Sequence, residues 1–409
     1  MPLGADNTLY VYLPAAISFC ATLAAAVMAY GVHPAWVEQA PPAWGLSVIM
    51  LSRRLQWPMI ATSLILCLAL LGLVISGKRR AWWLIGLAPV LALFGHRFLT
   101  DPTNRYAVAD EPAFVCAADA PFVRDEDHVV GVVFNERAYA YPYAVLHRSP
   151  VVMQSDREHR MLLMWSPRAN AATALSVARE VKARELDIVS EPADGLLVYN
   201  ARSGEFVAAV TGATPKGDKP AGVEGRLAVA KLTWKQWKAR QPETRVMLPV
   251  DGKYAGPTGP LPPRDPAAPR VALVGGALVG GAKPLAVLER EVTPAPINAL
   301  AGDVPVLLFR DPAGRVAAFD RRIEPDLSPK FRTNTERKRS MSAAFIDADT
   351  NTGWTIEGVA VDAERPMRGR KLAAVPVQEN VYWQPVRFWF GDLPLHAPPA
   401  AAGTAHARR

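Results

Sequence analysis

The chain has 409 residues and a formal net charge of +8, which is long enough for two or three domains with cores of their own. Its basic residues are scattered apart from Arg337-Lys338-Arg339, so the charge is a general surface property and argues against nucleic-acid binding. Cys116 is the only cysteine after residue 100, which excludes a disulfide or a two-cysteine metal or redox site within that part.

Three apolar segments in the first 100 residues are typical of membrane-spanning helices. Val11–Val32 and Trp57–Gly77 carry no charge, while Trp82–Phe98 is shorter and ends in His96 and Arg97. A helix needs about 20 apolar residues to cross the hydrocarbon core of a bilayer. The first two segments meet this requirement, and the third is predicted to span as well, with a buried or interfacial helix as the alternative.

Charged residues between these segments predict the orientation of the chain. Lys78–Arg80 form the loop between the second and third segments, and basic loops favour the cytoplasmic side. Arg53-Arg54 in the opposite loop act against this orientation, and Trp44–Leu55 is predicted to be a short amphipathic helix along the membrane surface. We therefore expect a multi-pass protein of the bacterial inner (cytoplasmic) membrane, embedded in the lipid bilayer, with its C-terminal domain outside the cytoplasm.

Short β-branched runs replace the apolar segments after residue 100. Residues 101–126 are rich in Pro, Ala and Asp, which is typical of a connecting arm. His128–Phe134 and Arg137–Tyr141 are predicted strands joined by a turn at Asn135-Glu136. Farther along, the apolar spacing within Ala171–Glu185 predicts an amphipathic helix.

A phrase that reads Ala-x-Pro-x-Ala-Val-Leu occurs twice, at Ala140–Leu146 and at Ala282–Leu288. Other runs recur in the same order, so we predict that the large C-terminal part is a tandem duplication. The recurring runs are the hairpin His128–Tyr141 with Val271–Val274 and Ala277–Val279, Met161–Trp165 with Val304–Phe309, Leu196–Tyr199 with Ala344–Ile346, Val210–Gly212 with Ile356–Gly358, Gly225–Val229 with Gly369–Ala373, and Trp234 and Trp237 with Trp383 and Trp389.

These patterns predict N-terminal transmembrane helices followed by a mainly β (α+β) domain made of two tandem repeats, related by a pseudo-twofold axis. Trp234 and Trp237 are predicted to lie on one face of a short helix. The expected divisions are a membrane anchor at 1–100, a connecting arm at 101–126, a first β-rich repeat at 127–248, a Pro/Gly linker at 249–270, a second β-rich repeat at 271–393 and a disordered tail at 394–409.

Four groups of phrases in the soluble part resemble one bacterial family, catalogued as domain of unknown function 3179, over about residues 112–393. The resemblance implies an extracytoplasmic, often membrane-attached protein, and some members of the family carry selenocysteine. The phrases are Val129–Val133 with Ala138–Pro142 and Leu146-His147, Leu196–Asn200 with Ser203-Gly204 and Thr211-Gly212, Leu232–Trp234 with Trp237 and Pro242–Arg245, and Trp354 and Gly358 with Trp383 and Phe388–Phe390.

The resemblance also implies a site, which this chain keeps only in part. Family members typically carry His-Glu shortly before Asn-Asp and then Tyr-Cys-Pro-Leu-Cys, an arrangement that suggests a metal or thiol-redox site. Here the histidine is His147, but Arg148 follows it, and the second stretch aligns with Met164–Arg168, where only the proline is kept. The chain has lost the sulfur atoms that such chemistry requires.

The candidate functional residues are therefore a histidine and a set of aromatic side chains. His147, Asp156 and His159 are the residues to consider for a metal site or an acid–base pair, although Asp156–Arg160 also has the pattern of a charged hairpin turn and no metal is predicted. The candidate ligand-binding residues are His147, Tyr141, Trp165, Tyr199, Trp354 and Trp383.

For function, we expect a membrane-anchored extracytoplasmic accessory or binding protein that is not an enzyme and that takes no cofactor. Its expected partners are the lipid bilayer and other membrane or periplasmic proteins. One alternative is a metal- or cofactor-dependent, redox-type enzyme that uses His147 and neighbouring polar residues. Another is a ligand-binding module with tryptophans lining a pocket between the two copies.

Overall fold

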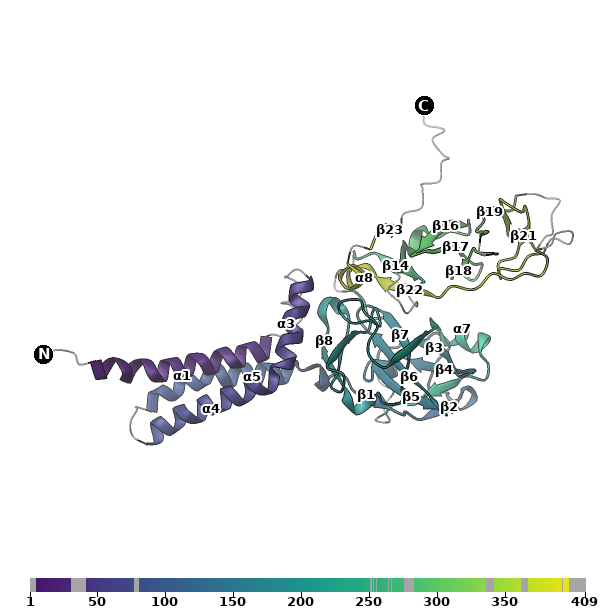
Figure 1. Cartoon of the computed structure of the whole chain (residues 1–409). Coiled ribbons are helices and arrows are strands. Elements are labelled where there is room, and N and C mark those ends of the chain that lie inside the picture. Colours follow the sequence, from purple (N-terminus) through teal and green to yellow (C-terminus); the bar gives the residue numbers. More distant parts are fainter. Residues whose placement is uncertain are drawn as a thin grey trace, which may run out of the picture.

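The computed structural model shows a helical bundle followed by two β-rich lobes (Figure 1). The basic segments Lys78–Arg80 and Arg337–Arg339 and the predicted strand Ala277–Val279 lie outside the described residues. The structure describes residues 5–30, 42–76, 81–250, 252, 254, 256–263, 265, 267–275, 283–324, 326–335, 342–361, 367–391 and 393–396.

The helical bundle consists of α1 (Ala5–Tyr30), α4 (Gln56–Ile75) and the pair η1 (Ala81–Leu87) and α5 (Ala88–Thr100). Small residues of α1 let the helices pack closely, with Ala21 and Ala25 in one cluster with Val90 of α5. Within the described residues, three helices are long and apolar enough to cross a membrane, which agrees with the segments predicted from the sequence. The qualifying stretches are Tyr12–Ala29, Gln56–Ile75 and Trp83–Thr100.

The first lobe, which we call the N-lobe, comprises residues 108–247 and three sheets. Their strand orders are β12-β3-β4-β13-β2, β1-β5-β6-β7-β11 and β10-β9-β8. Two short helices, α6 (Tyr143–Leu146) and α7 (Trp234–Arg240), connect the strands. The strands are β1 (Val108–Asp110), β2 (Phe114–Cys116), β3 (His128–Phe134), β4 (Arg137–Pro142), β5 (Val151–Asp156), β6 (His159–Ser166), β7 (Ala171–Val177), β8 (Leu186–Ser190), β9 (Leu197–Asn200), β10 (Glu205–Ala208), β11 (Val223–Leu227), β12 (Val229–Thr233) and β13 (Arg245–Met247).

Several local predictions for the N-lobe are confirmed. β3 and β4 form the predicted antiparallel hairpin, and Asn135 and Glu136 in its turn both have positive φ, at 49° and 63°. Such a turn matches the twist of the two strands. The helix α7 also forms, with Trp234 and Trp237 buried and Thr233 and Gln236 in a capping box at its start.

The helix predicted at Ala171–Glu185 is wrong. Ala171–Val177 is the strand β7, which pairs with β6 on one side and β11 on the other. Nearly all of its residues are buried, because both faces of the strand are covered. A strand that is buried on both faces does not alternate between apolar and polar residues. Its apolar spacing therefore resembled that of a helix. The expected connecting arm also contributes structure, since it contains β1 and β2.

The second lobe, which we call the C-lobe, comprises residues 270–396. Its sheets have the orders β22-β14-β15-β23, β16-β17-β18 and β19-β20-β21, and α8 (Trp383–Phe390) follows β22. The first residues of the expected disordered tail form β23, which pairs with β15. The strands are β14 (Arg270–Val274), β15 (Leu285–Leu288), β16 (Ile297–Ala301), β17 (Val304–Arg310), β18 (Val316–Asp320), β19 (Phe331–Thr333), β20 (Phe345–Asp347), β21 (Gly353–Trp354), β22 (Val377–Tyr382) and β23 (Leu395–His396).

The two lobes connect their main sheets in the same order. In the N-lobe, β12 pairs antiparallel with the first strand of the hairpin β3-β4, and α7 then leads to β13, which is parallel to β4. In the C-lobe, β22 pairs antiparallel with the first strand of the hairpin β14-β15, and α8 then leads to β23, which is parallel to β15. The repeated phrase, however, does not occupy equivalent places. Its last four residues form α6 in the N-lobe, at Tyr143–Leu146, and the strand β15 in the C-lobe, at Leu285–Leu288.

The lobes meet along an apolar contact. Ala169, Ala171 and Val210 of the N-lobe share a buried cluster with residues such as Leu273 and Val381 of the C-lobe. Burial of apolar surface of this kind is the main force that holds two lobes together. The strand β22 lies along this contact and touches both β12 and β7. Two cavities at the lobe contact, described below, are lined by residues of β22.

Helix α3 (Pro42–Arg54) joins the helical bundle to the N-lobe. It confirms the helix predicted near Trp44–Leu55, but its buried face packs on protein: Leu46 and Ile49 contact a cluster that includes Leu197 and Phe206. The guanidinium of Arg53 also pairs with the carboxylate of Asp187 in β8. These contacts fix the N-lobe against the bundle.

Candidate functional site

The N-lobe wall of the candidate site comes from the neighbouring strands β12 and β3. Lys231 lies opposite Val130, and Thr233 lies opposite His128. Directly opposed residues and residues two apart share one face of a sheet. His128, Lys231 and Thr233 therefore project from the same face of the sheet, and all three line the same cavity.

The C-lobe closes this cavity with β22 and the short helix η6 (Glu289–Glu291). The cavity volume is about 440 Å³, which is within the usual range for small-molecule sites. We call it the interlobe cleft. Its polar lining residues are His128, Tyr143, Asn170, Lys231, Thr233 and Gln236 from the N-lobe and Arg270, Glu289, Arg315, Glu379 and Asn380 from the C-lobe.

Two asparagines hold the lobes together at the cleft. The side chain of Asn170 accepts a hydrogen bond from the Tyr143 hydroxyl at 2.9 Å and donates one to the backbone carbonyl of Asn380 at 2.8 Å. The backbone N–H of Asn380 in turn donates to Glu289 Oε2 at 3.2 Å. Both asparagines have positive φ, 48° and 55°, a conformation that asparagine tolerates better than most residues. Strained backbone of this kind is often found at functional sites.

Lys231 and Glu379 give the cleft unusual electrostatics. Burial lowers the pKa of Lys231 to about 7, although Glu289 and Glu379 act to raise it. Burial raises the pKa of Glu379 to about 7, opposed by a hydrogen bond to the backbone of Val316. The Lys231 ammonium also donates to the backbone carbonyl of Asn170. The cleft therefore holds an amine and a carboxyl group that both titrate near neutral pH.

His128 adds a third titratable group. Burial lowers its pKa, and the nearby Lys231 lowers it further, while Asp127 acts in the opposite direction. Its ring lies 5.6 Å from that of Tyr143, between ring centres. Perturbed ionisable groups that converge in a cavity are a recognised mark of a functional site. Chemically, the cleft offers the amine of Lys231 on the N-lobe side, and on the C-lobe side the carboxyl groups of Glu289 and Glu379 together with the guanidinium groups of Arg270 and Arg315.

Tyr141 and Trp165, which the sequence suggested as ligand-binding residues, lie in the core of the N-lobe instead of in the cleft. Both are fully buried. The Tyr141 hydroxyl is hydrogen-bonded to Gln154, and Trp165 packs on Tyr143 with ring centres 4.5 Å apart. These contacts are typical of a structural core.

His147 lies beside Trp165, with ring centres 4.8 Å apart in an edge-on arrangement. Burial lowers the pKa of His147 to about 4, and a hydrogen bond with the backbone of Gly259 opposes this shift. Its Nε2 is buried and, within the described residues, has no hydrogen-bond partner. At neutral pH the side chain is therefore an uncharged imidazole held between an indole and backbone.

Asp156 and His159 are not brought to His147. They face each other across the β5-β6 hairpin, whereas His147 precedes the opposite end of β5. Asp156 contacts Asn135 and Arg137 instead, at 3.3 and 3.5 Å. In the part of the chain that the structure describes, no three His, Cys, Asp or Glu side chains form a group that could hold a metal ion.

The other three aromatic candidates lie in three separate places. Tyr199 packs on Phe206 at the junction with α3. Trp354 is fully buried in the C-lobe and donates from Nε1 to Asp347 at 2.9 Å. Trp383 begins α8 and packs at the edge of the lobe contact. Of the histidine and aromatic candidates, His147 and Trp165 are in ring contact.

Sequence reasoning missed Lys231, Glu289, Glu379 and Asn170. One local signal was present: Lys231 interrupts the strand Val229–Thr233, where a charged side chain has to find a polar environment or reach solvent. Nothing in the sequence joined this lysine to a glutamate almost 150 residues away, because only the contact between the lobes does so.

Comparison with known proteins gives a family and no more specific relative. The profile of the family described as "Protein of unknown function (DUF3179)" matches residues 107–390. No curated protein and no solved structure matches the chain. The matched residues include the N-lobe, the C-lobe up to the end of α8, the interlobe cleft and the contacts of Asn170. Because the match spans well over half of the sequence, the chain belongs to the DUF3179 family.

Proposed function

We propose that this protein is a membrane-anchored binding protein that holds a small polar molecule in the interlobe cleft. The observation that carries the proposal is a cavity of about 440 Å³ with half-buried Lys231, Glu289 and Glu379 around it, contributed by both lobes. Each of these three groups has one backbone partner and can form further hydrogen bonds, which a bound ligand would provide.

The charges suggest the class of ligand. Lys231 matches an anionic group, while Glu289 and Glu379 match an ammonium group or hydroxyl donors. The ligand class that fits both is a small zwitterion of the size of an amino acid. An accessory role with a membrane or periplasmic partner is compatible with such binding. The geometry favours binding over a metal or redox enzyme centred on His147, because neither Asp156 nor His159 lies beside that imidazole.

Replacement of Lys231 by methionine tests the proposal. The full chain in detergent would be titrated calorimetrically with each of the twenty L-amino acids. We expect at least one to bind the wild type, and Lys231→Met to weaken that binding at least about tenfold, because a charge-assisted hydrogen bond contributes about 1.5–3 kcal/mol. Lys235→Met changes an exposed lysine of α7 and should bind like the wild type. The proposal fails if no amino acid binds, or if Lys231→Met binds as tightly as the wild type.

We also propose that the two lobes arose by duplication and are related by a pseudo-twofold axis, with repeats at 127–248 and 271–393 around a linker at 249–270. The common strand order of the main sheets supports this. The positions of two tryptophans also support the duplication. Trp234 begins α7 directly after β12, and Trp383 begins α8 directly after β22. Leu232 of β12 lies opposite Val129 of β3, and Val381 of β22 lies opposite Val271 of β14. This register supports the correspondence of Leu232 with Val381.

We further propose that the helices at 1–100 anchor the chain in the bacterial inner membrane as a multi-pass bundle and that both lobes lie outside the cytoplasm. Cys116 provides a test because it is exposed on the N-lobe, whereas Cys20 and Cys67 lie within the apolar helices. A membrane-impermeant maleimide added to spheroplasts should label the wild type and not Cys116→Ser. If Cys116 were labelled only after the cells were lysed, the lobes would lie in the cytoplasm and the proposed orientation would be wrong.

A further inference from the structure

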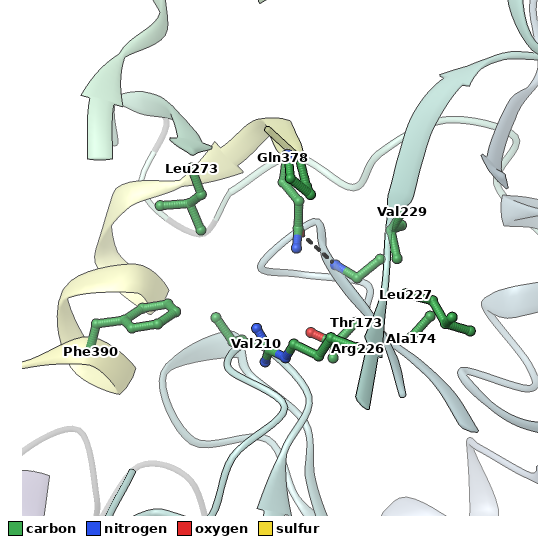
Figure 2. Close-up of a pocket in the computed structure, with 11 residues that line it drawn as sticks. Thr173, Ala174, Val210, Arg226, Leu227, Val229, Leu273, Gln378 and Phe390 are labelled. Atoms are coloured by element: carbon green, nitrogen blue, oxygen red, sulfur yellow. Dashed lines mark hydrogen bonds between the residues drawn. The ribbon is translucent and has the colours of Figure 1, made fainter. Parts of the chain in front are cut away.

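A second, smaller pocket lies at the lobe contact near the start of β22. Its cavity volume is about 20 Å³, enough for one water-sized group, and it opens toward solvent. Figure 2 shows Arg226 and Thr173 of the N-lobe beside Val210, with Leu273, Gln378 and Phe390 of the C-lobe around them. We call it the Arg226 pocket.

Arg226 brings an uncompensated positive charge to this pocket. Its side chain is half-buried, and among the described residues its guanidinium has no hydrogen bond or ion pair. Burial alone lowers the pKa of Arg226 to about 10, so the group stays charged at neutral pH. A charge removed from water without a partner is unfavourable, and a bound anion would relieve this.

Thr173 brings a second unused donor. The residue is only 3% exposed, and its hydroxyl has no hydrogen-bond partner within the described part of the chain. Buried hydroxyls are nearly always paired, so an unpaired one beside a cation points to a missing acceptor. The neighbouring Gln378 accepts a hydrogen bond from the backbone N–H of Ala172 at 3.1 Å (Figure 2), which leaves its amide nitrogen as a further donor.

Gly212 makes room for this arrangement. Its φ is +63°, and a Cβ at this position would lie 2.3 Å from Arg226 Nη2 and 2.5 Å from Thr173 Cγ2. Any side chain at residue 212 would therefore displace both donor-bearing side chains. The glycine thus serves the pocket as well as the backbone turn.

We propose that the Arg226 pocket binds the carboxylate group of a small organic acid whose short apolar chain lies against Phe390, Leu273 and Val210. The planar guanidinium can donate two parallel hydrogen bonds to a carboxylate, and the Thr173 hydroxyl can donate a third. The cavity has room for about one carboxylate oxygen, so the second oxygen and the apolar chain lie in its open mouth. This site is separate from the interlobe cleft and does not rest on Lys231.

Butyrate is the probe for this site. Sodium butyrate would be titrated into the full chain in detergent, in a buffer free of other carboxylates, and followed by calorimetry. We expect saturable binding to the wild type that weakens at least about tenfold in Arg226→Gln and in the nearly isosteric Thr173→Val. Arg245→Gln alters an exposed arginine of β13 and should bind like the wild type.

The variants distinguish binding in the Arg226 pocket from binding in the interlobe cleft. Loss of butyrate binding in Lys231→Met but not in Arg226→Gln would place the acid in the interlobe cleft and overturn the proposal. Chloride that competes with butyrate at equal affinity would overturn it as well, because the pocket would then be a general anion site. If Arg226→Gln does not fold, Thr173→Val decides, since it keeps the shape of the side chain. Absence of butyrate binding to the wild type would refute the site.

Discussion

Replacing Trp165 by alanine is expected to lower the free energy of unfolding of the N-lobe by about 4 kcal/mol. The side chain is fully buried, and it contacts Tyr143 and His147 at ring-centre distances of 4.5 and 4.8 Å. Truncation would remove these contacts and leave a cavity between the two large sheets, where surrounding side chains cannot collapse fully. Urea unfolding of the full chain in detergent, followed by circular dichroism, measures the change.

Trp165→Phe serves as the matched variant because it keeps an aromatic ring and leaves a smaller void. We expect it to lose about 1–2 kcal/mol. Binding at the interlobe cleft should survive in the phenylalanine variant, because Trp165 does not line that cavity. If Trp165→Ala instead kept the wild-type stability and lost ligand binding, the residue would be part of a site and its placement in the core would be wrong.

Replacing Asn170 by alanine is expected to destabilise the contact between the lobes by about 3 kcal/mol. Asn170 is 2% exposed, and its side chain connects Tyr143 of the N-lobe to the backbone of Asn380 in the C-lobe. Alanine would leave the Tyr143 hydroxyl and the Asn380 carbonyl without these partners. It would also have to adopt a φ of 48°, which is unfavourable for an alanine.

Asn170→Gly separates the two causes, because glycine accepts positive φ without strain but also lacks the amide. We expect it to lose about 1 kcal/mol less than Asn170→Ala. Hydrogen exchange of the β22 amides should rise in both variants, since this strand lies at the loosened contact. Wild-type exchange rates in both variants would show that the asparagine does not hold the lobes together.

The local structure of this protein was predictable where a short pattern had one physical meaning. Asn135-Glu136 between a valine-rich run and the run Arg137–Tyr141 predicted a tight turn, and β3 and β4 form as expected. Trp234 and Trp237, three residues apart, were predicted on one face of a short helix, and α7 is found there with both side chains buried. Ala171–Val177 failed because its apolar residues are covered on both faces, and such a strand has no period that distinguishes it from a helix.

The candidate site was not predictable in the same way. Lys231, Glu289 and Glu379 lie far apart in the chain and carry no spacing that links them. His147 drew attention through the family resemblance, yet the structure places it against Trp165 and the backbone of Gly259. A lone charged residue in a strand has many possible partners, and the sequence does not choose among them.

The sequence by itself determined three properties of this protein. Long apolar runs determined the three helices long enough to span a bilayer, a single cysteine after residue 100 excluded a two-cysteine site within that part, and ordered phrases identified the DUF3179 family. Each of these depends on composition or on neighbours in the chain.

Only the tertiary structure decided where binding is possible. The interlobe cleft and the Arg226 pocket exist because β22 of one lobe lies against β12 and β7 of the other. That contact desolvates Lys231, Glu379 and Arg226 and shifts their pKa values. The physical reason is that backbone periodicity follows from local residue order, whereas burial and electrostatic environment follow from which distant surfaces meet.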